Sequence, residues 1–187
     1  MYRGWALAEQ WQGKEGIAQI RQGLTAYRAT GAEMAVPYFL ALLAEAYGKV
    51  GEAEQGLAAL VEALAQVEQT GERWYEAELY RLKGKLALQS RVQGPESKNP
   101  SPLPLAPSTQ AEAAAEACFL KAIEIARKQQ AKSWELRAVM SLSRLWHSQG
   151  KKDAGRKMLA EIYGWFTEGF DTKDLQEAKA LIEEMSH

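Results

Sequence analysis

The sequence predicts an all-α protein made of repeated helical hairpins. Ala, Leu, Glu, Gln and Lys are common outside one short region, and apolar residues recur three and four positions apart, which is the helical period. Shifting the chain by forty residues against itself also aligns residues of the same kind. The aligned pairs are Gly16 with Gly56, Ile17 with Leu57, Ile20 with Leu60, Gly23 with Ala63, and Leu24 with Leu64.

The segment 40–64 defines the repeated unit, because two apolar helical runs flank a turn at Gly51. Small residues stand where the two helices of this hairpin have to approach each other closely. They are Ala44, Gly56 and Ala63. The same spacing of small and large residues returns in each later unit, so the repeat is a feature of the fold and not only of the composition.

The first unit, residues 1–31, is incomplete, because its first helix is shorter than in the other units. It ends at Gly31, and the second unit, residues 32–71, ends at Gly71. A glycine at both places is typical of a helix that ends in the left-handed conformation. Either Met1 is a shortened start or the natural chain begins upstream. We favour the second alternative, since a repeat array normally begins with a complete unit or a polar capping helix.

A proline-rich insertion interrupts the third unit, residues 72–130. Residues 92–108 hold five of the six prolines of the chain and few apolar side chains. Such a run can neither continue a helix nor form its own core, so we predict a flexible or polyproline-like loop. The remaining proline, Pro37, falls near the start of a predicted helix, where the missing amide donor is tolerated.

The fourth unit, residues 131–166, is followed by a separate helix. Trp146 takes the place of an aromatic core residue of the second unit, which predicts a packed position and not an exposed stacking platform. A break then precedes an amphipathic helix at 171–186, for which Asp171 or Thr172 is the expected N-cap. We expect this helix to close the array as a terminal cap.

The charge balance and the cysteine content restrict the compartment and the partners. The chain has 23 basic and 24 acidic side chains, so no overall field favours nucleic acid or an anionic membrane as a partner. No apolar run approaches the roughly 18–20 residues that cross a bilayer, and the N-terminus lacks the order of a secretory signal. The single Cys118 excludes an internal disulfide and fits a reducing compartment. We therefore predict a soluble, cytoplasmic protein.

The residues give no sign of catalysis, of a metal site or of another cofactor. There is no Gly-rich phosphate loop. The two histidines, His147 and His187, have no further His or Cys at metal-ligand spacing. Cys118 lies beside Phe119 on a packing helix without a His nearby in sequence, which favours a buried structural thiol over a nucleophile.

The hairpins resemble tetratricopeptide repeats. Residues 37–48, 71–84 and 165–175 are also similar to the C-terminal repeat region of large bacterial signalling proteins. In those proteins a class III adenylate or guanylate cyclase domain, or a transcription-activator domain, precedes a P-loop ATPase module and then the repeats. The resemblance implies a right-handed α-solenoid that serves as a regulatory, partner-binding arm, with no catalytic residue in this chain.

The same resemblance implies a binding groove. In the tetratricopeptide fold, the first helix of each hairpin lines a concave face through four positions of the repeat. In this sequence the four positions of the second, third and fourth units are Tyr38, Ala41, Glu45 and Gly48, then Glu78, Arg81, Lys85 and Leu88, then Arg137, Met140, Arg144 and His147.

The later half of this groove is basic and has apolar spots. Its cations are Arg81, Lys85, Arg137 and Arg144. They are expected to bind an acidic peptide, a C-terminal carboxylate or a phosphate through charge-assisted hydrogen bonds, while Met140 and Leu88 take apolar side chains. In the alternative interpretation these charges only keep the protein soluble, some of them paired with Glu78 or Glu135.

Charge reversal at Arg81 and Arg144 together is expected to abolish partner binding and to leave the helices intact. The partner is expected to be a protein, a peptide or another domain of the parent chain. The chaperone-tail clamp of this repeat family is not matched closely, because its Lys and Asn are replaced here by Arg and Ala.

Three alternatives to peptide binding stay open. The first hairpin would form a homodimer if it exposed its apolar side chains, which are Trp5, Leu7, Ile17 and Ile20. The groove would hold a small ligand if the chain were a sensor arm that controls an upstream cyclase or ATPase. The third alternative is an enzyme.

Overall fold

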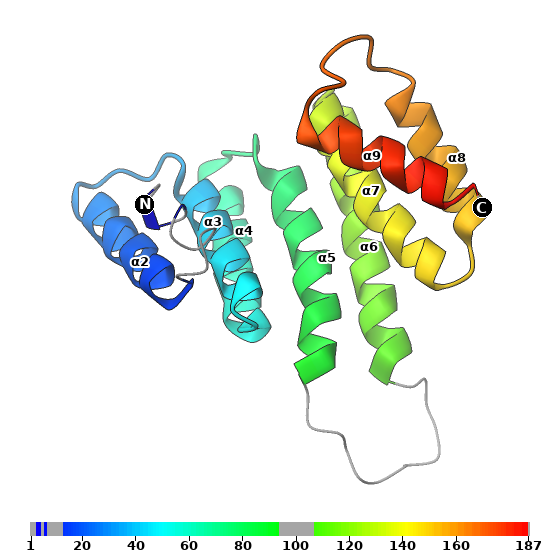
Figure 1. The fold of residues 1–187 in the computed structure, drawn as a ribbon. Helices are drawn as coiled ribbons and strands as arrows, with labels where there is room; N and C mark the ends of the chain where they lie inside the picture. The colour runs from blue at the N-terminus through cyan, green and yellow to red at the C-terminus, as the bar shows by residue number, and fades with distance from the viewer. Residues whose placement is uncertain (1–2, 5, 7–12, 94–106, 187) are drawn as a thin grey trace, which may run out of the picture.

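The computed structural model describes residues 3, 4, 6, 13–93 and 107–186, and these residues contain eight long α-helices and no strand. Consecutive helices pack as antiparallel pairs, one pair after another along the chain (Figure 1). The all-α prediction is therefore confirmed. The helices are α2 (Gly13–Ala29), α3 (Val36–Lys49), α4 (Ala53–Thr70), α5 (Glu76–Gln93), α6 (Pro107–Lys128), α7 (Lys132–Ser148), α8 (Lys152–Tyr163) and α9 (Lys173–Glu184).

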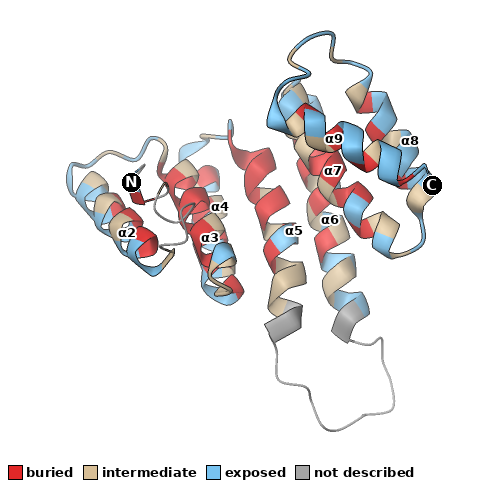
Figure 2. Cartoon of the chain, in the orientation of Figure 1, coloured by how far each residue is buried: buried red, intermediate tan, exposed pale blue. Residues whose placement is uncertain are grey.

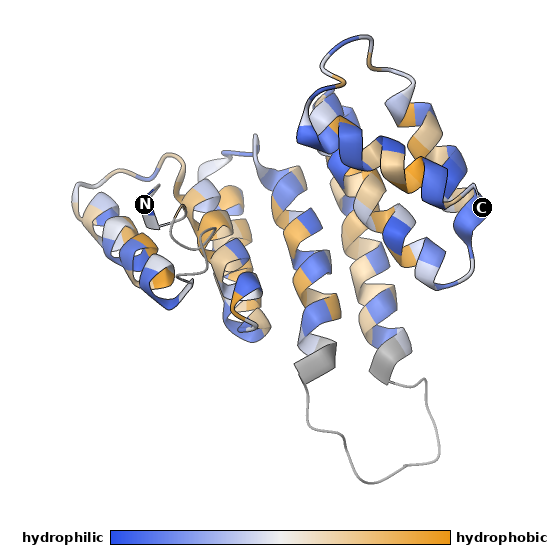
Figure 3. Cartoon of the chain, viewed as in Figure 1, coloured by the Kyte–Doolittle hydropathy of each residue, from blue (hydrophilic) through white to orange (hydrophobic). Residues whose placement is uncertain are grey.

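The apolar core consists of two main clusters that meet at α5. The first joins α2, α3 and α4, and Leu79, Leu82 and Leu86 of α5 belong to it. The second joins α6, α7, α8 and α9, with Tyr80 and Leu88 of α5 packed against it. Figure 2 shows red, buried residues along α3 and the first half of α5. Figure 3 shows hydrophilic and apolar residues alternating along these helices and along α9.

Small residues bring the paired helices close together, as the repeat pattern predicts. A Cβ atom on Gly56 of α4 would lie 3.0 Å from the carbonyl oxygen of Ala44 on α3. In the pair α7–α8, a Cβ atom on Gly155 would lie 3.3 Å from the carbonyl oxygen of Ser143, whose hydroxyl donates to the carbonyl oxygen of Gly155. At both places a β-carbon would crowd the facing backbone, and the two helices would have to move apart by a few tenths of an ångström to accept it.

Left-handed residues follow α2, α4 and α6, the second helices of the first three units, whereas Gly164 after α8 is right-handed. Gly31 and Gly71 have φ angles of 76° and 71°. Gln130 takes the corresponding place after α6, with a φ angle of 55°, although it carries a side chain. The left-handed conformation costs a non-glycine residue about 1–2 kcal/mol, so the third pair ends in a strained residue where its two predecessors use glycine.

Replacing Gln130 by Gly is expected to stabilise the protein. The left-handed strain is relieved, and this effect outweighs the greater freedom of Gly in the unfolded chain. The free energy of unfolding is expected to rise by about 0.5–1 kcal/mol. Urea unfolding followed by circular dichroism measures it. The matched change in the opposite direction is Gly71→Ala, which should lower the free energy of unfolding by a similar amount. A loss of stability in Gln130→Gly would contradict the assignment of strain.

The predicted loop at 92–108 is wrong at both edges. Helix α5 continues to Gln93, because no helix breaker precedes the glycine that follows it, and α6 already begins at Pro107. Proline fits the first turn of a helix, since the amide that it lacks would have no partner there. Residues 94–106, the remainder of the predicted loop, lie outside the described residues.

The final helix has the predicted position but not the predicted cap. Thr172 is the N-cap residue of α9 and is extended, yet its hydroxyl donates to the carbonyl oxygen of Gly169 at 2.7 Å and not to the helix. Asp171 makes no side-chain cap either. The Thr172 hydroxyl is already engaged with the turn at Gly169 and does not cap the helix. Helix α9 is therefore held mainly by its apolar side.

Cys118 and the tryptophans depart from the predicted burial. Cys118 was predicted to be buried but is only half-buried, because it lies at the edge of the α6 packing face. Even this partial burial raises the pKa of its thiol. Trp146 is half-buried and packs against the second cluster. Trp74 and Trp165 are half-exposed, while Trp5 and Trp11, like His187, lie outside the described residues.

The N-terminal dimer hypothesis loses part of its basis. Ile17 and Ile20 of α2 are buried against α3 and α4 in the first cluster, so they are not exposed for a second copy. Trp5 and Leu7, the other two residues of that hypothesis, lie outside the described residues. None of the described helices is long and apolar enough to span a membrane.

Candidate functional site

A groove of about 640 Å³ opens between α3, α5, α7 and α9. Each helix contributes side chains three or four positions apart, which form one stripe along its inner side. The charged and aromatic lining residues are Tyr38, Glu45 and Lys49 of α3, Tyr75, Glu78, Arg81 and Lys85 in and just before α5, Arg137 and Arg144 of α7, and Lys173, Asp174 and Glu177 of α9.

The structure brings most of the predicted groove residues together. Those that line the groove are Tyr38, Glu45, Glu78, Arg81, Lys85, Arg137, Met140 and Arg144. His147 is not among the lining residues, and its Nδ1 lies 3.7 Å from Glu184 Oε1 on α9. Ala41 was placed wrongly, because it is only 1% exposed and belongs to the core, and Leu42 lines the groove instead. The remaining two, Gly48 and Leu88, line smaller crevices beside it.

Glu78 forms the centre of a buried charge network on the groove wall. Its carboxylate accepts hydrogen bonds from Arg81 Nε at 2.8 Å and Nη2 at 2.7 Å, and Arg137 Nη2 of α7 lies 3.0 Å away. Burial is the largest single influence on the pKa of Arg81 and would lower it, but the hydrogen bonds to Glu78 together with the charges of Glu78 and Glu45 raise the pKa overall. One carboxylate therefore fixes two guanidinium groups from two helices.

An aromatic row runs beside this network. The ring centres of Tyr38 and Tyr75 lie 4.9 Å apart, and those of Tyr75 and Trp134 lie 5.2 Å apart. The guanidinium of Arg137 lies over the Trp134 ring, 5.3 Å from its centre, in a cation–π contact. Burial, and next the charge of Glu78, raise the pKa of Tyr75, so its ring stays neutral. These rings hold the end of the groove rigid.

Helix α9 forms a wall of the groove, which the sequence did not reveal. Arg144 Nη2 lies 3.0 Å from Glu177 Oε2, and Arg137 Nε lies 3.9 Å from Asp174 Oδ2. The acidic residues of α9 therefore face the cations of α7 that were assigned to a partner. Asp174 and Glu177 are three residues apart on one helical side, and this spacing was the available signal.

Lys85 is a cation of the groove that has no direct partner. It makes no hydrogen bond or ion pair with any described residue. Partial burial and the neighbouring Arg81 lower the pKa of its ammonium group. Burial, Lys85 and Lys173 likewise lower the pKa of Lys49 on the opposite wall. Glu45 and Glu78 act on Lys85 in the opposite sense, and Lys173 lies 3.8 Å from Glu177. The groove lining as a whole has six cations and four carboxylates, a modest positive excess that an anion would neutralise.

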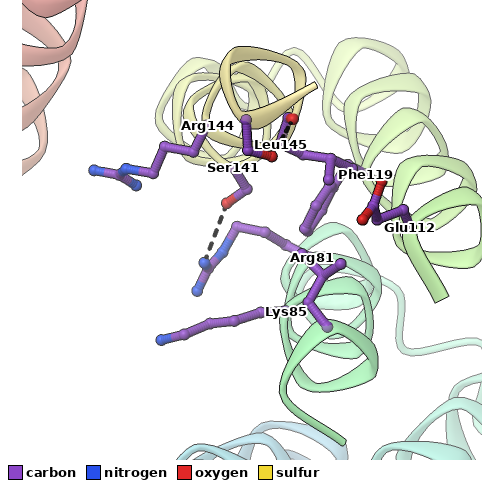
Figure 4. Close-up of a pocket in the computed structure, with 9 residues that line it drawn as sticks. Arg81, Lys85, Glu112, Phe119, Ser141, Arg144 and Leu145 are labelled. Atoms are coloured by element: carbon purple, nitrogen blue, oxygen red, sulfur yellow. Dashed lines mark hydrogen bonds between the residues drawn. The ribbon is translucent and has the colours of Figure 1, made fainter. Parts of the chain in front are cut away.

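A second pocket, of about 360 Å³, joins the groove between α5, α6 and α7. The two share Arg81, Lys85, Ser141 and Arg144. Figure 4 shows Phe119 of α6 behind the space between α5 and α7, with the side chains of Lys85 and Arg144 extending to one side. Within the described part of the chain, no three His, Cys, Asp or Glu side chains are placed to hold a metal ion.

Comparison with known proteins gives one partial similarity. No family model matches the chain. An uncharacterized protein of Rhizobium meliloti (strain 1021) is 31% identical over 83 residues, which are 44% of this chain and 8% of that protein. The similarity thus covers less than half of the present chain and a small part of a much longer one. It fits a helical repeat-like domain and assigns no activity.

Proposed function

We propose that this chain is a tetratricopeptide-like right-handed solenoid that binds an acidic protein segment in its groove and serves as an arm of a larger bacterial signalling protein. The forty-residue repeat and the left-handed residues at the ends of successive pairs support the repeat type. The similarity to a short stretch of a much longer bacterial protein supports the context. The proposed role is binding and not catalysis.

The convergence of the three predicted stripes carries the proposal. Residues of α3, α5 and α7, far apart in the sequence, line one groove. The buried Glu78 holds Arg81 and Arg137 in place before any partner arrives. A site with side chains already ordered loses less conformational entropy on binding, so a larger part of the contact energy appears as affinity.

The charge distribution supports an acidic partner. Lys85 makes no hydrogen bond or ion pair with a described residue, and Lys49 lies near enough to Lys173, itself 3.8 Å from Glu177, for the two to influence each other. Arg144 is half-exposed and can exchange Glu177 of α9 for a carboxylate of the partner. An extended segment with Asp or Glu side chains therefore complements this end of the groove.

Panning a phage-displayed random-peptide library on the immobilised protein tests the proposal. Peptides rich in Asp and Glu are expected to be enriched. Lys85→Glu combined with Arg144→Glu is expected to weaken their binding by about 100-fold or more, since each charge-assisted hydrogen bond contributes about 1.5–3 kcal/mol. Fluorescence anisotropy with the enriched peptides measures this loss.

Lys83→Glu is the matched control, because Lys83 lies on α5 two residues from Lys85 and does not line the groove. It makes the same change in net charge as Lys85→Glu alone, which is half that of the double variant, and should retain binding. Equal losses in the control and in the groove variant would show only a long-range charge effect. Either that result or enrichment of peptides without acidic residues would contradict the proposed function.

A further inference from the structure

The pocket between α5, α6 and α7 has the size and lining of a small-molecule site. Its volume of about 360 Å³ lies within the roughly 300–1,000 Å³ that such sites occupy. Its apolar residues are Leu88, Phe119 and Leu145, one from each of the three helices. Phe119 and Leu145 are only 1% and 5% exposed, so the core fixes both and little of either is accessible, while the half-buried Leu88 presents more apolar surface. An apolar group that entered the pocket would meet a rigid, preformed surface.

The polar groups of the pocket are unevenly distributed. Lys85 and Arg144 extend to the same side in Figure 4, and Glu112 lies on the other side of Phe119. Glu112 accepts a hydrogen bond from Gln149 Nε2 at 3.0 Å. An anionic group would therefore be attracted to the side of Lys85 and repelled from the side of Glu112.

Lys85 is the cation at this side that has no hydrogen-bonded or ion-paired carboxylate among the described residues, although the charges of Glu45 and Glu78 act on it at longer range. Arg81 is bound through two nitrogens to Glu78, and Arg144 is paired with Glu177. Lys85 has no such partner in the described part of the chain, and partial burial lowers its pKa. A singly charged carboxylate would match this charge better than a doubly charged phosphate group.

We propose that this pocket binds a small amphiphilic carboxylate. Its apolar body lies against Phe119, Leu88 and Leu145, and its carboxylate accepts hydrogen bonds from Lys85 and Arg144. The site is separate from the peptide groove in its apolar part but shares these cations with it. A bound carboxylate and an acidic peptide therefore compete for the same two side chains.

Sodium octanoate, below the concentration at which it forms micelles, is the probe. Isothermal titration calorimetry is expected to show one saturable site, and the melting temperature is expected to rise with octanoate concentration. Octanamide keeps the apolar body without the charge, and acetate keeps the charge without the body. Both are expected to bind at least about tenfold more weakly. Equal binding of octanoate and octanamide would overturn the proposal.

Two variants assign the binding to this pocket. Lys85→Gln is expected to weaken octanoate binding by about tenfold or more. Ser148→Leu places an apolar side chain at the pocket wall and is expected to reduce binding at least as much. Ser133→Leu is its control, because Ser133 is an exposed serine at the other end of α7. Octanoate binding that survives Ser148→Leu, or is lost in Ser133→Leu, would overturn the proposal.

Peptide panning reports on the groove independently, so failure of one assignment leaves the other standing.

Discussion

Glu78→Gln is expected to destabilise the protein by about 3–5 kcal/mol, although the substitution hardly changes the shape of the side chain. The carboxylate is 2% exposed and holds both Arg81 and Arg137. A neutral amide removes the paired counter-charge of Arg81, which is itself buried, and leaves Arg137 only Asp174 at 3.9 Å. Removing one partner of a buried ion pair is costly, because the remaining charge stays out of water.

Urea unfolding followed by circular dichroism measures the loss. Glu124→Gln is the control, because Glu124 is an exposed carboxylate that also pairs with two cations, Lys121 and Lys128. Water replaces such exposed pairs readily, so a much smaller loss is expected there. If both variants lost the same stability, the buried charge of Glu78 would not be what holds the groove wall.

The role of Glu78 changes what is expected of Arg81. Charge reversal at Arg81 and Arg144 was predicted from the sequence to abolish binding while the helices stay intact. In the structure, Arg81→Glu would place a second carboxylate beside the buried Glu78. This variant is expected to unfold the groove wall, and so it cannot test binding. Lys85, which has no described partner, replaces Arg81 in the binding experiment.

Phe119→Ala is expected to cost about 3–5 kcal/mol, since Phe119 is the largest of the fully buried side chains. Its ring lies directly over Gly84 of α5, where a Cβ atom would come within 2.6 Å of it. Gly84→Ala alone is therefore expected to cost about 1–3 kcal/mol through overpacking. In the double variant the new methyl group occupies part of the cavity, so the total loss is expected to be smaller than the sum of the two.

Thermal and urea unfolding of the two single variants and the double variant form the cycle that measures this coupling. The control is Leu120→Ala, the next residue along α6, which is 44% exposed and should change stability by less than about 1 kcal/mol. Strictly additive losses in the double variant would contradict the close contact between Gly84 and Phe119.

The helices and the groove stripe were predictable because they depend on local spacing. Apolar periodicity and turn glycines place α3, α4, α7 and α8, and the repeat register aligns Tyr38, Arg81 and Arg144 on one side. Ala41 was misplaced because a shift of one residue turns a helical side chain by about 100°, which separates the core side from the groove side.

The charge pairing was not predictable in the same way. Glu78 was read as a groove residue and as a possible partner for a cation, but its burial depends on how α5 and α7 pack against each other. The position of α9 likewise depends on the contacts of Leu175, Leu181 and Met185 with the second cluster. A polar helical side in the sequence does not tell which cations it will face, since pairs between distant segments have no fixed spacing.

The shared position of α5 has a consequence for the proposed signalling role. Because α5 contributes to both apolar clusters and to the groove wall, neither half of the molecule can loosen without removing part of the support of the other. In repeat arrays, free energy passes between neighbours through such interfaces. Occupancy of the groove is thereby linked to the order of the helices at both ends of the chain, and this thermodynamic linkage can transmit a binding event to whatever domains adjoin them.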